Sequence, residues 1–488
     1  MQAENKKFLK LLAVTVLPLL IQSVFTQSIN FIDQIMVSSL GTEAIAAIGA
    51  SNKLLSLYNS FLYGSCSGCA MFMAQYWGKR DYDGFRKILG VLMTITFIVG
   101  VFFSALVLMI PERLMLIFNN DQAVVSLGVK YMRAVVPAYF MMSIIFPMEY
   151  MLRSMNRVKV TMINSIISVL INCLANYILI YGKMGFPKLG VVGAALGTVI
   201  CRIAAFSVLI IYNVISKNEI MRQPLKLFTY NITYVKAFFK KALPLVGNEM
   251  MWSLGTTIYF IIYGRVGTEA LAAMSIMQTL QMLAKIVSGG FCGACSIIIG
   301  NEIGRGDLDR VNRYCKKFHL TALIVGITSG IVVYSMINPM LDIYSIKGTE
   351  VGKYVSQCMM VLAVYIVMNA CNSINVEGIF RSGGDIAYLT LMDMGSIWLI
   401  GMPITVITGM ILKLNVVYVY CAYLFVEIYK LPLGYYRFKS GKWLHLLYKE
   451  TEDKGRGTCK KYVRNRFKYI KNPKNYILLL NLYCMYLS

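Results

Sequence analysis

Long runs of apolar residues recur along this chain and limit the folds that it can adopt. Ile88–Ile110 and Thr321–Ile337 are two of them, and about 20 apolar residues are enough for a helix to cross the hydrocarbon core of a bilayer. Charged residues make up only 15% of the 488 residues, whereas a soluble domain has about 25%. A transmembrane β-barrel would need strands of alternating polarity, and these runs do not alternate. The sequence therefore predicts an all-α polytopic membrane protein.

Twelve membrane-spanning helices can be placed, six in each half of the chain. We expect them at about 11–36, 44–76, 88–110, 131–152, 160–181, 190–215, 242–263, 269–300, 316–338, 355–380, 387–411 and 415–435.

The second half of the chain repeats the first. The phrase GTEA occurs at Gly41 and again at Gly267, an offset of 267 − 41 = 226. At the same offset Leu17–Leu19 matches Leu243–Leu245, and both segments read Leu-Pro-Leu. Later in each half, LRSMN (152–156) corresponds to FRSGG (380–384), at an offset of 228. An internal repeat of this length indicates two structurally similar lobes.

The repeat and the charge pattern together predict the organisation of the chain. We expect an N-terminal lobe at 8–216, a connector at 217–236, a C-terminal lobe at 237–436 and a basic tail at 437–488. Six spans per half give both lobes the same orientation, so the repeat is parallel and a binding site is expected between the lobes.

Lysine and arginine are concentrated in alternate loops, which sets the expected orientation. Cytoplasmic loops are the ones enriched in these residues, so both termini and the connector are predicted to be cytoplasmic, in a multi-pass protein of the cell membrane. The cations that carry this pattern include Lys6, Lys7, Lys10, Lys79, Arg80, Arg86, Lys87, Arg157, Lys159, Lys217, Arg222, Lys240, Lys241, Arg305, Arg310 and Arg313. The net charge of +25 is thereby explained by the membrane rather than by nucleic acid.

Asp33 is the clearest candidate for chemistry. It lies late in the first span, fifteen residues after Pro18, a natural kink point in the same helix. Ionisable residues inside membrane spans are costly and usually functional. The repeat has Tyr259 where this half has Asp33. An idle carboxylate at the outer interface is the alternative.

Other polar residues inside the spans give further candidates. Glu249 and Asp393 are acidic residues of the second half. Asn172 and Asn176 are four residues apart, so they share one face of the fifth span. Their amides suit either an interhelical hydrogen bond or, together with a carboxylate, a hard cation such as sodium.

Two acidic residues each precede an arginine by four positions. Glu149 precedes Arg153 and Glu377 precedes Arg381, a spacing that favours ion pairs along a helix. We interpret both pairs as structural.

Several function classes lack their sequence signatures. The chain has no GxxxxGK[ST] phosphate loop, so no direct use of a nucleotide is expected. His319 and His445 are isolated, and the pairs Cys66–Cys69 and Cys292–Cys295 have no histidine nearby, so no metal or cofactor is predicted. An ion gradient of H⁺ or Na⁺ is left as the energy source, and no obligate protein partner is evident.

The duplicated halves, the basic loop after the second span, RSGGD after the tenth span and an aspartate late in the first span resemble the MATE family, the multidrug and toxic compound extrusion antiporters. The resemblance covers about residues 8–435. It implies two six-helix lobes that export varied, often cationic, organic compounds in exchange for H⁺ or Na⁺ by alternating access.

The resemblance also assigns roles to residues. Asp33 matches the ion-binding aspartate of such proteins, and Pro18 matches the proline upstream of it. The family often pairs this aspartate with Asn-x-x-x-Asp on the fifth span, where this chain has Asn172 and Asn176. The missing second carboxylate makes a sodium site in this lobe less expected.

Two rival functions remain open. A flippase for a lipid-linked precursor, from the same superfamily, would need several cations in its cavity. The helices of the first lobe offer few candidate cations, and Arg202 is the one that we find. An integral membrane enzyme would need a clustered acid–base or metal motif, which is not visible. The tail at 451–488 fits no part of the repeat, and its apolar end, Ile477–Leu487, is too short to span a bilayer.

Overall fold

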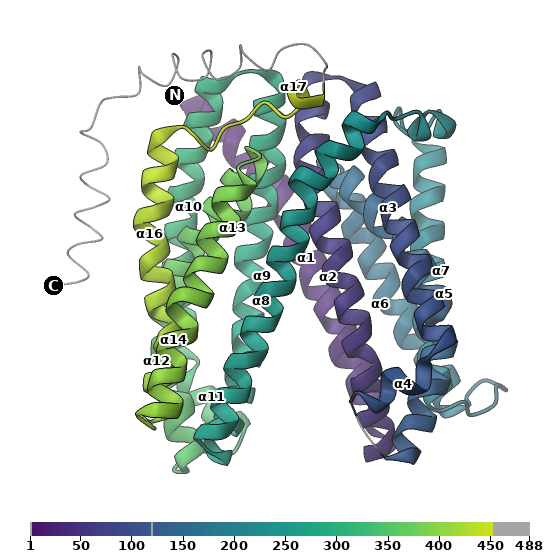
Figure 1. The fold of residues 1–488 in the computed structure, drawn as a ribbon, viewed down its shortest axis with the longest axis vertical. Coiled ribbons are helices and arrows are strands. Elements are labelled where there is room, and N and C mark those ends of the chain that lie inside the picture. Colours follow the sequence, from purple (N-terminus) through teal and green to yellow (C-terminus); the bar gives the residue numbers. More distant parts are fainter. Residues whose placement is uncertain (1, 119–120, 452–488) are drawn as a thin grey trace.

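The computed structural model describes residues 2–118 and 121–451, and this part of the chain forms helices joined by short connections (Figure 1). The first half consists of α1 (Gln2–Ser38), α2 (Thr42–Lys79), α3 (Tyr82–Met109), α4 (Pro111–Leu116), α5 (Gln122–Ser154), α6 (Val158–Tyr181) and α7 (Val191–Ile215). A 3₁₀ turn, η1 (Pro224–Phe228), lies in the connector.

The second half repeats this order. It consists of α8 (Ile232–Val266), α9 (Thr268–Arg305), α10 (Leu308–Ser335), α11 (Ile337–Ile343), α12 (Glu350–Ser373) with the π-helix η2 (Ile374–Phe380), α13 (Ile386–Gly395) with η3 (Ser396–Gly401), α14 (Met402–Val406) and η4 (Ile407–Ile411), then α15 (Val416–Tyr420), α16 (Ala422–Ser440) and α17 (Tyr448–Thr451).

All twelve predicted spans are helical in the structure. Within the described residues, ten helices are long and apolar enough to cross a membrane on their own composition. The other two long helices are α2, whose repeat equivalent is α9, and α8, whose repeat equivalent is α1. The short helices α4 and α11, which the sequence reading did not place, also occupy equivalent positions, because Pro111 and Ile337 differ by 226.

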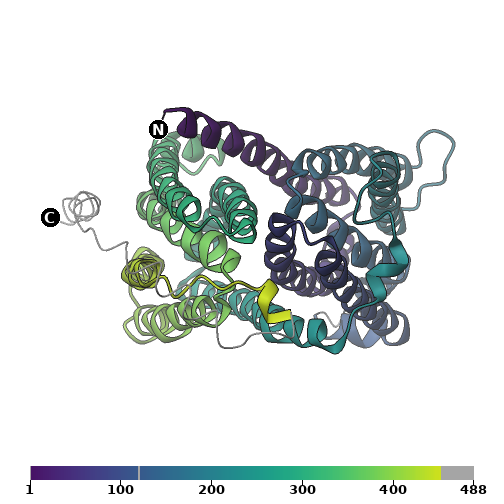
Figure 2. The same cartoon turned by 90° about the horizontal axis from the view of Figure 1, so that it is seen from above.

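The helices form two bundles side by side (Figure 2). In the N-terminal lobe α5 packs against α2, α3 and α7, and α6 packs against α1 and α7. In the C-terminal lobe α12 packs against α9, α10 and α16. The first turns of α1 reach across to the other lobe, where Phe8 contacts Tyr314 and Phe318 of α10. The C-terminal lobe was predicted to end at residue 436, whereas its last helix, α16, continues to Ser440.

The lobes meet at the end of the molecule that carries the N-terminus, the α2–α3 and α9–α10 turns and α17, which we call the basic end (Figure 1). Here α2 packs against α8 and α9, and α1 packs against α9. Gly78 lies against the backbone of Asn301, and its repeat equivalent Gly304 lies against the backbone of Gln75. A Cβ atom at either glycine would overlap that backbone, so the missing side chains let the helices approach this closely.

We call the opposite end of the molecule the far end. Toward this end, the faces of α2 and α9 that meet the other lobe become exposed. Gly64 of α2 and Gly290 of α9 are packed against Val246 and Leu20 of the other lobe. Two turns further along, on the same faces, Leu57 is 44% exposed and Leu283 is 57% exposed. The lobes are thus joined at the basic end and separated toward the far end, and we call the space between them the inter-lobe cleft.

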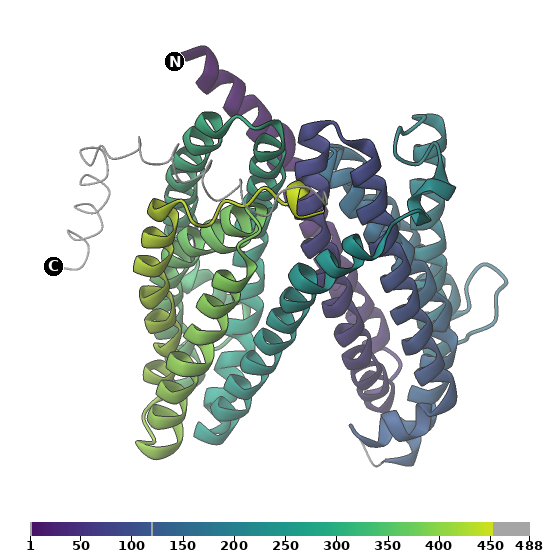
Figure 3. The same cartoon turned by 45° about the horizontal axis from the view of Figure 1, so that its top comes forward.

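Residues 441–451, after the last span, form a strap across the basic end (Figure 3). The Gln75 side chain of α2 donates to the carbonyls of Ser382 (3.0 Å) and His445 (3.1 Å) and accepts from the Leu447 amide (2.8 Å). Trp443 and Leu447 are buried. The strap therefore links α16 of one lobe to α2 of the other. The remainder of the predicted tail, 452–488, lies outside the described residues.

An ion pair anchors the strap to the C-terminal lobe. Arg437 of α16 contacts both carboxylate oxygens of Asp385, at 2.6 and 2.9 Å, and His445 Nε2 lies 3.8 Å from the same group. Burial alone would raise the pKa of Asp385, but hydrogen bonds from His445 and Arg437 hold this pKa below its usual value. The anchor is therefore ionised at neutral pH.

Candidate functional site

Asp33 lies in the N-terminal lobe against the two asparagines predicted to accompany it. The Asn176 amide nitrogen on α6 donates a hydrogen bond to Asp33 Oδ1 on α1 at 2.5 Å, and it lies 3.4 Å from Asn172 Oδ1. Both asparagines are buried. Gly197 of α7 packs directly on the Asn176 side chain, where a Cβ atom would overlap it. The structure thus brings together Asp33, Asn172 and Asn176, the three residues that were expected to lie together.

Arg202 of α7 supplies the positive charge nearest to this group. It attracts the Asp33 carboxylate electrostatically, yet the two form no ion pair in the described structure. Its Nε atom is buried and has no hydrogen-bond acceptor among the described residues. The Asp33 carboxylate therefore has an amide as its direct partner and Arg202 only as a distant counter-charge. Binding of a cation or a proton to this carboxylate would change the electrostatic energy of the group strongly.

In the C-terminal lobe, Asp393 has a direct cationic partner. Asp393 Oδ1 on α13 lies 2.9 Å from Lys430 Nζ on α16, and Asn248 Nδ2 donates to Asp393 Oδ2 at 3.4 Å. Arg202 of α7 and Lys430 of α16 are both cations in the last span of their lobe. Of these two cations, only Lys430 has a direct acidic partner in the described structure.

Glu249 also has a direct partner. Its Oε1 atom lies 3.3 Å from Arg381 Nη2, and Arg381 Nη1 donates to Ser67 Oγ of α2 at 2.7 Å. This chain of contacts joins α8, the end of η2 and the opposite lobe. Glu249 is therefore placed where the two lobes meet, at the base of the inter-lobe cleft.

The predicted pairing of Glu377 with Arg381 is wrong. Residues 374–380 form a π-helix rather than an α-helix, and the wider i→i+5 turn removes the register that would align residues four apart. Arg381 consequently points to Glu249 and Ser67 instead. Glu377 has neither a hydrogen bond nor an ion pair in the described structure.

The equivalent pair in the first lobe has the expected geometry. Arg153 Nη2 lies 3.9 Å from Glu149 Oε2 on the regular helix α5. Glu149 also accepts hydrogen bonds from Asn164 Nδ2 at 3.0 Å and from Gln22 Nε2 at 3.4 Å. Pro18 lies within α1, one turn before Gln22, and is buried.

Tyr259 occupies the place in the C-terminal lobe that Asp33 occupies in the N-terminal lobe. It is 3% exposed, and its hydroxyl donates to the Ile397 carbonyl at 3.4 Å. Gly401 leaves room for this hydroxyl. A phenol replaces the carboxylate here, and Thr405 and Lys430 lie near it in place of the two asparagines, so this position cannot bind a cation in the same way.

Two polar groups inside the spans were not among the predicted site residues. Glu427 Oε2 accepts from Asn372 Nδ2 at 2.7 Å and its Oε1 accepts from Asn369 Nδ2 at 3.1 Å. Lys285 of α9 lies with its Nζ 4.2 Å from the centre of the Trp252 ring on α8. The signal for Lys285 was a lone lysine in the middle of an apolar run, which a survey of cations in loops passes over.

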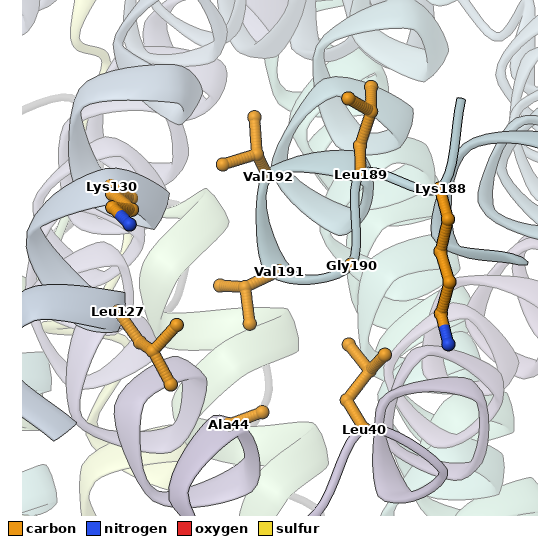
Figure 4. A pocket seen from close by; sticks show the side chains of 9 residues that line it. All are labelled: Leu40, Ala44, Leu127, Lys130, Lys188, Leu189, Gly190, Val191 and Val192. Atoms are coloured by element: carbon orange, nitrogen blue, oxygen red, sulfur yellow. The ribbon is translucent and has the colours of Figure 1, made fainter. Parts of the chain in front are cut away.

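A surface cavity of ≈ 380 Å³ opens at the far end of the N-terminal lobe (Figure 4). It lies between the α1–α2 turn, α5 and the α6–α7 loop, and Lys130 and Lys188 stand on opposite sides of apolar walls. None of the predicted site residues lines it. This cavity is therefore separate from the Asp33 group and from the inter-lobe cleft.

Two six-helix lobes, joined at one end and carrying intramembrane polar groups, define the architecture of a membrane transporter. The MatE family model matches residues 18–178 and again 244–407. The two matches begin 244 − 18 = 226 residues apart, which is the offset of the sequence repeat. The chain therefore belongs to the MatE family of membrane transporters.

Relatives of full length agree with this assignment. The uncharacterized transporter YisQ of Bacillus subtilis is 23% identical over 415 residues, which is 84% of this chain and 90% of YisQ. The probable multidrug resistance protein YoeA of the same organism is 23% identical, over 88% of this chain and 93% of YoeA. The probable multidrug resistance protein NorM of Halalkalibacterium halodurans is 22% identical, over 81% and 86%.

Solved structures show the same fold. A MATE crystal structure in the straight conformation superposes with a TM-score of 0.79 at 16% identity, covering 91% of this chain and 97% of that one. The Vibrio cholerae MATE transporter VcmN gives a TM-score of 0.81 at 13% identity, over 91% and 99%.

Proposed function

We propose that this protein is a secondary active multidrug exporter, an antiporter that expels organic compounds in exchange for a cation. The observation that carries the proposal is Asp33, a carboxylate inside the first lobe that has an amide for a partner and no ion pair in the described structure. The names of relatives such as YoeA and NorM support drugs as the cargo.

The orientation of the protein in the membrane is inferred from its charges. The basic end holds Lys79, Arg80, Arg157 and Arg305 in its turns, and such turns face the cytoplasm. The far end, where Leu57 and Leu283 are exposed, then faces the outside. We infer that this conformation is outward-open, with both termini in the cytoplasm.

In the proposed cycle an ion from outside binds at Asp33 and neutralises it. Neutral Asp33 no longer holds Asn176 and Arg202 as strongly, so α1 can shift against α6 and α7, and substrate is released outward. The empty carrier then opens at the basic end, which requires the glycine contacts of α2 with α9 and the strap on Gln75 to separate.

The coupling ion is proposed to be a proton. A sodium ion needs several oxygen ligands, but Asn176 presents a donor nitrogen to Asp33, and Arg202 places another positive charge nearby. Asn176 also stands where the family often has a second carboxylate. A proton binds one oxygen and needs none of these additional ligands.

A lipid-linked precursor flippase is less well supported. Such a carrier needs free cations for phosphate groups, whereas Lys430 and Arg381 are already paired with Asp393 and Glu249. Lys285 and Arg202 have no acidic partner within ion-pair distance among the described residues, and they lie in different lobes.

The test is uptake of a fluorescent organic cation into everted membrane vesicles, energised by a pH gradient or a sodium gradient applied separately. The proposal expects uptake driven by the pH gradient that collapses on addition of a protonophore. Uptake that depends on neither the pH gradient nor the sodium gradient would contradict antiport.

A further inference from the structure

Lys285 lies at mid-height of α9, 17 residues after Thr268 and 20 before Arg305, and its side chain is exposed. A lysine at this depth would be costly against lipid. It faces protein instead, because its ammonium lies over Trp252 of α8 at 4.2 Å. It also borders a narrow pocket with Tyr365 and Asn369 of α12. Lys285 therefore projects into the C-terminal lobe, in reach of solvent.

Four charged side chains act on Lys285 electrostatically: Glu249, Glu377, Glu427 and Lys430. Three of them have their own partners. Glu249 contacts Arg381, Glu427 accepts from two asparagines, and Lys430 contacts Asp393. The side chains of Lys285 and Glu377 remain, and neither side chain forms a direct hydrogen bond or ion pair in the described structure.

The position of Trp252 ties this group to the transport path. Trp252 follows Glu249 by three residues, one helical turn toward the far end. Glu249 marks the base of the inter-lobe cleft, since its partner Arg381 contacts Ser67 of the other lobe. Trp252 is 42% exposed, so part of its ring is accessible to a bound molecule.

We propose that the Trp252 ring and the Glu377 carboxylate form a subsite for the charged group of a lipophilic organic cation, and that Lys285 occupies this subsite in the empty carrier. The lysine is thus a tethered competitor that the substrate displaces. Aromatic faces attract cations, and the position of Lys285 shows that this ring accepts one. The inference rests on the proposed function, because it names the substrate class of the same cleft.

The local charge favours a cation over an anion. Around the subsite, four carboxylates (Glu249, Glu377, Glu427 and Asp393) stand against three cations (Lys285, Lys430 and Arg381). Displacing Lys285 with a substrate cation keeps the ring occupied by positive charge. An anionic substrate would instead enter a region with an excess of carboxylates.

The experiment measures binding of tetraphenylphosphonium and of tetraphenylborate, two ions of the same shape and opposite charge, to the purified full-length protein by calorimetry. Lys285→Met should lower the Kd of tetraphenylphosphonium about fivefold, which is about 1 kcal/mol, the usual strength of a cation–π contact. Lys285→Arg, which keeps the competing charge, should leave this Kd unchanged. Lys347→Met, at an exposed loop lysine paired with Asp342, is the matched control.

A second variant separates competition at the ring from a general loss of positive charge. Trp252→Leu should weaken binding of tetraphenylphosphonium, and in that background Lys285→Met should have little further effect. An equal gain from Lys285→Met with and without Trp252 would overturn the competitor role. Weaker binding of tetraphenylborate to Lys285→Met, with tetraphenylphosphonium unchanged, would make Lys285 an anion site instead.

Failure of the proposed function is a separate outcome. If the wild-type protein binds tetraphenylphosphonium with the predicted dependence on Lys285 but does not move it across vesicles under either gradient, the subsite stands and antiport does not.

Discussion

The two lobes share one repeated fold, yet the charged side chains inside them have different kinds of partner. In the N-terminal lobe Asp33 has an amide partner and Arg202 has no ion pair in the described structure. In the C-terminal lobe the cation of the last span, Lys430, is 2.9 Å from Asp393, and Tyr259 stands at the position equivalent to Asp33. A carboxylate with a fixed counter-ion gains little from binding another cation. We therefore propose ion exchange in the first lobe and structural or substrate-binding roles in the second.

The largest expected effect comes from Asp33→Asn, which removes the exchanging charge and keeps the shape of the side chain. Transport of organic cations in vesicles should be lost while the protein still reaches the membrane at normal abundance. The matched control is Tyr259→Phe at the equivalent position of the other lobe, which should retain transport. Unchanged drug resistance in a sensitised host carrying Asp33→Asn would sink the assignment.

The next largest effect is on stability. Lys430→Met leaves the partly buried Asp393 without its counter-ion, and breaking a fully buried pair costs about 3–5 kcal/mol, so a loss toward the lower end of this range is expected. Arg202→Met breaks no direct ion pair and should cost less. Thermal unfolding of the two variants in detergent measures the difference, and the double variant with Lys430→Met and Asp393→Asn should recover part of the loss. Equal destabilisation by both single variants would show that the two cations are not used differently.

A smaller effect is expected at the contact between the lobes. Gly304→Ala places a Cβ atom against the Gln75 backbone, and overpacking of this kind costs about 1–3 kcal/mol. The variant should shift the protein toward opening of the basic end, measured as increased distances between spin labels on α2 and α9 in that region. Gly289→Ala, where a Cβ atom meets open space, is the control. A Gly304→Ala protein that stays closed would argue against this contact as the inner gate.

The smallest expected effect tests the choice of ion. Asn176→Asp restores the second carboxylate common in the family beside Asp33, and two carboxylates attract a hard cation better than one. We expect a few-fold stimulation of transport by sodium that the wild-type protein lacks. Sodium stimulation already present in the wild type would contradict the proposal of a proton as the coupling ion.

The sequence predicted the fold well, for physical reasons that are local. Apolar runs such as Ile88–Ile110 reveal spans because the bilayer demands them, and Gly41 and Gly267 reveal the repeat directly. The spacing of Asn172 and Asn176 puts both on one helix face, and the resemblance to the MATE family implied that this face lies against Asp33. The twelve spans thus followed from local patterns, and the group of Asp33, Asn172 and Asn176 followed from the resemblance.

Contacts between distant helices did not follow from the sequence. Lys430 pairs with Asp393 of another helix, and no local spacing indicates this contact. The pairing of Glu377 with Arg381 assumed an α-helix where the structure has a π-helix. The place of Lys285 in an apolar run does not reveal its neighbours, which come from α8, η2 and α16. Helical spacing therefore predicts partners within an element, and tertiary packing decides the others.

The most direct measurement is release of the coupling ion when substrate binds. Purified protein in a weakly buffered solution is mixed with tetraphenylphosphonium, and protons released are followed with a pH indicator. Our account predicts proton release from the wild-type protein, none from Asp33→Asn, and release from Tyr259→Phe equal to the wild type. Proton release that persists in Asp33→Asn would contradict the claim that the first lobe holds the exchanging carboxylate.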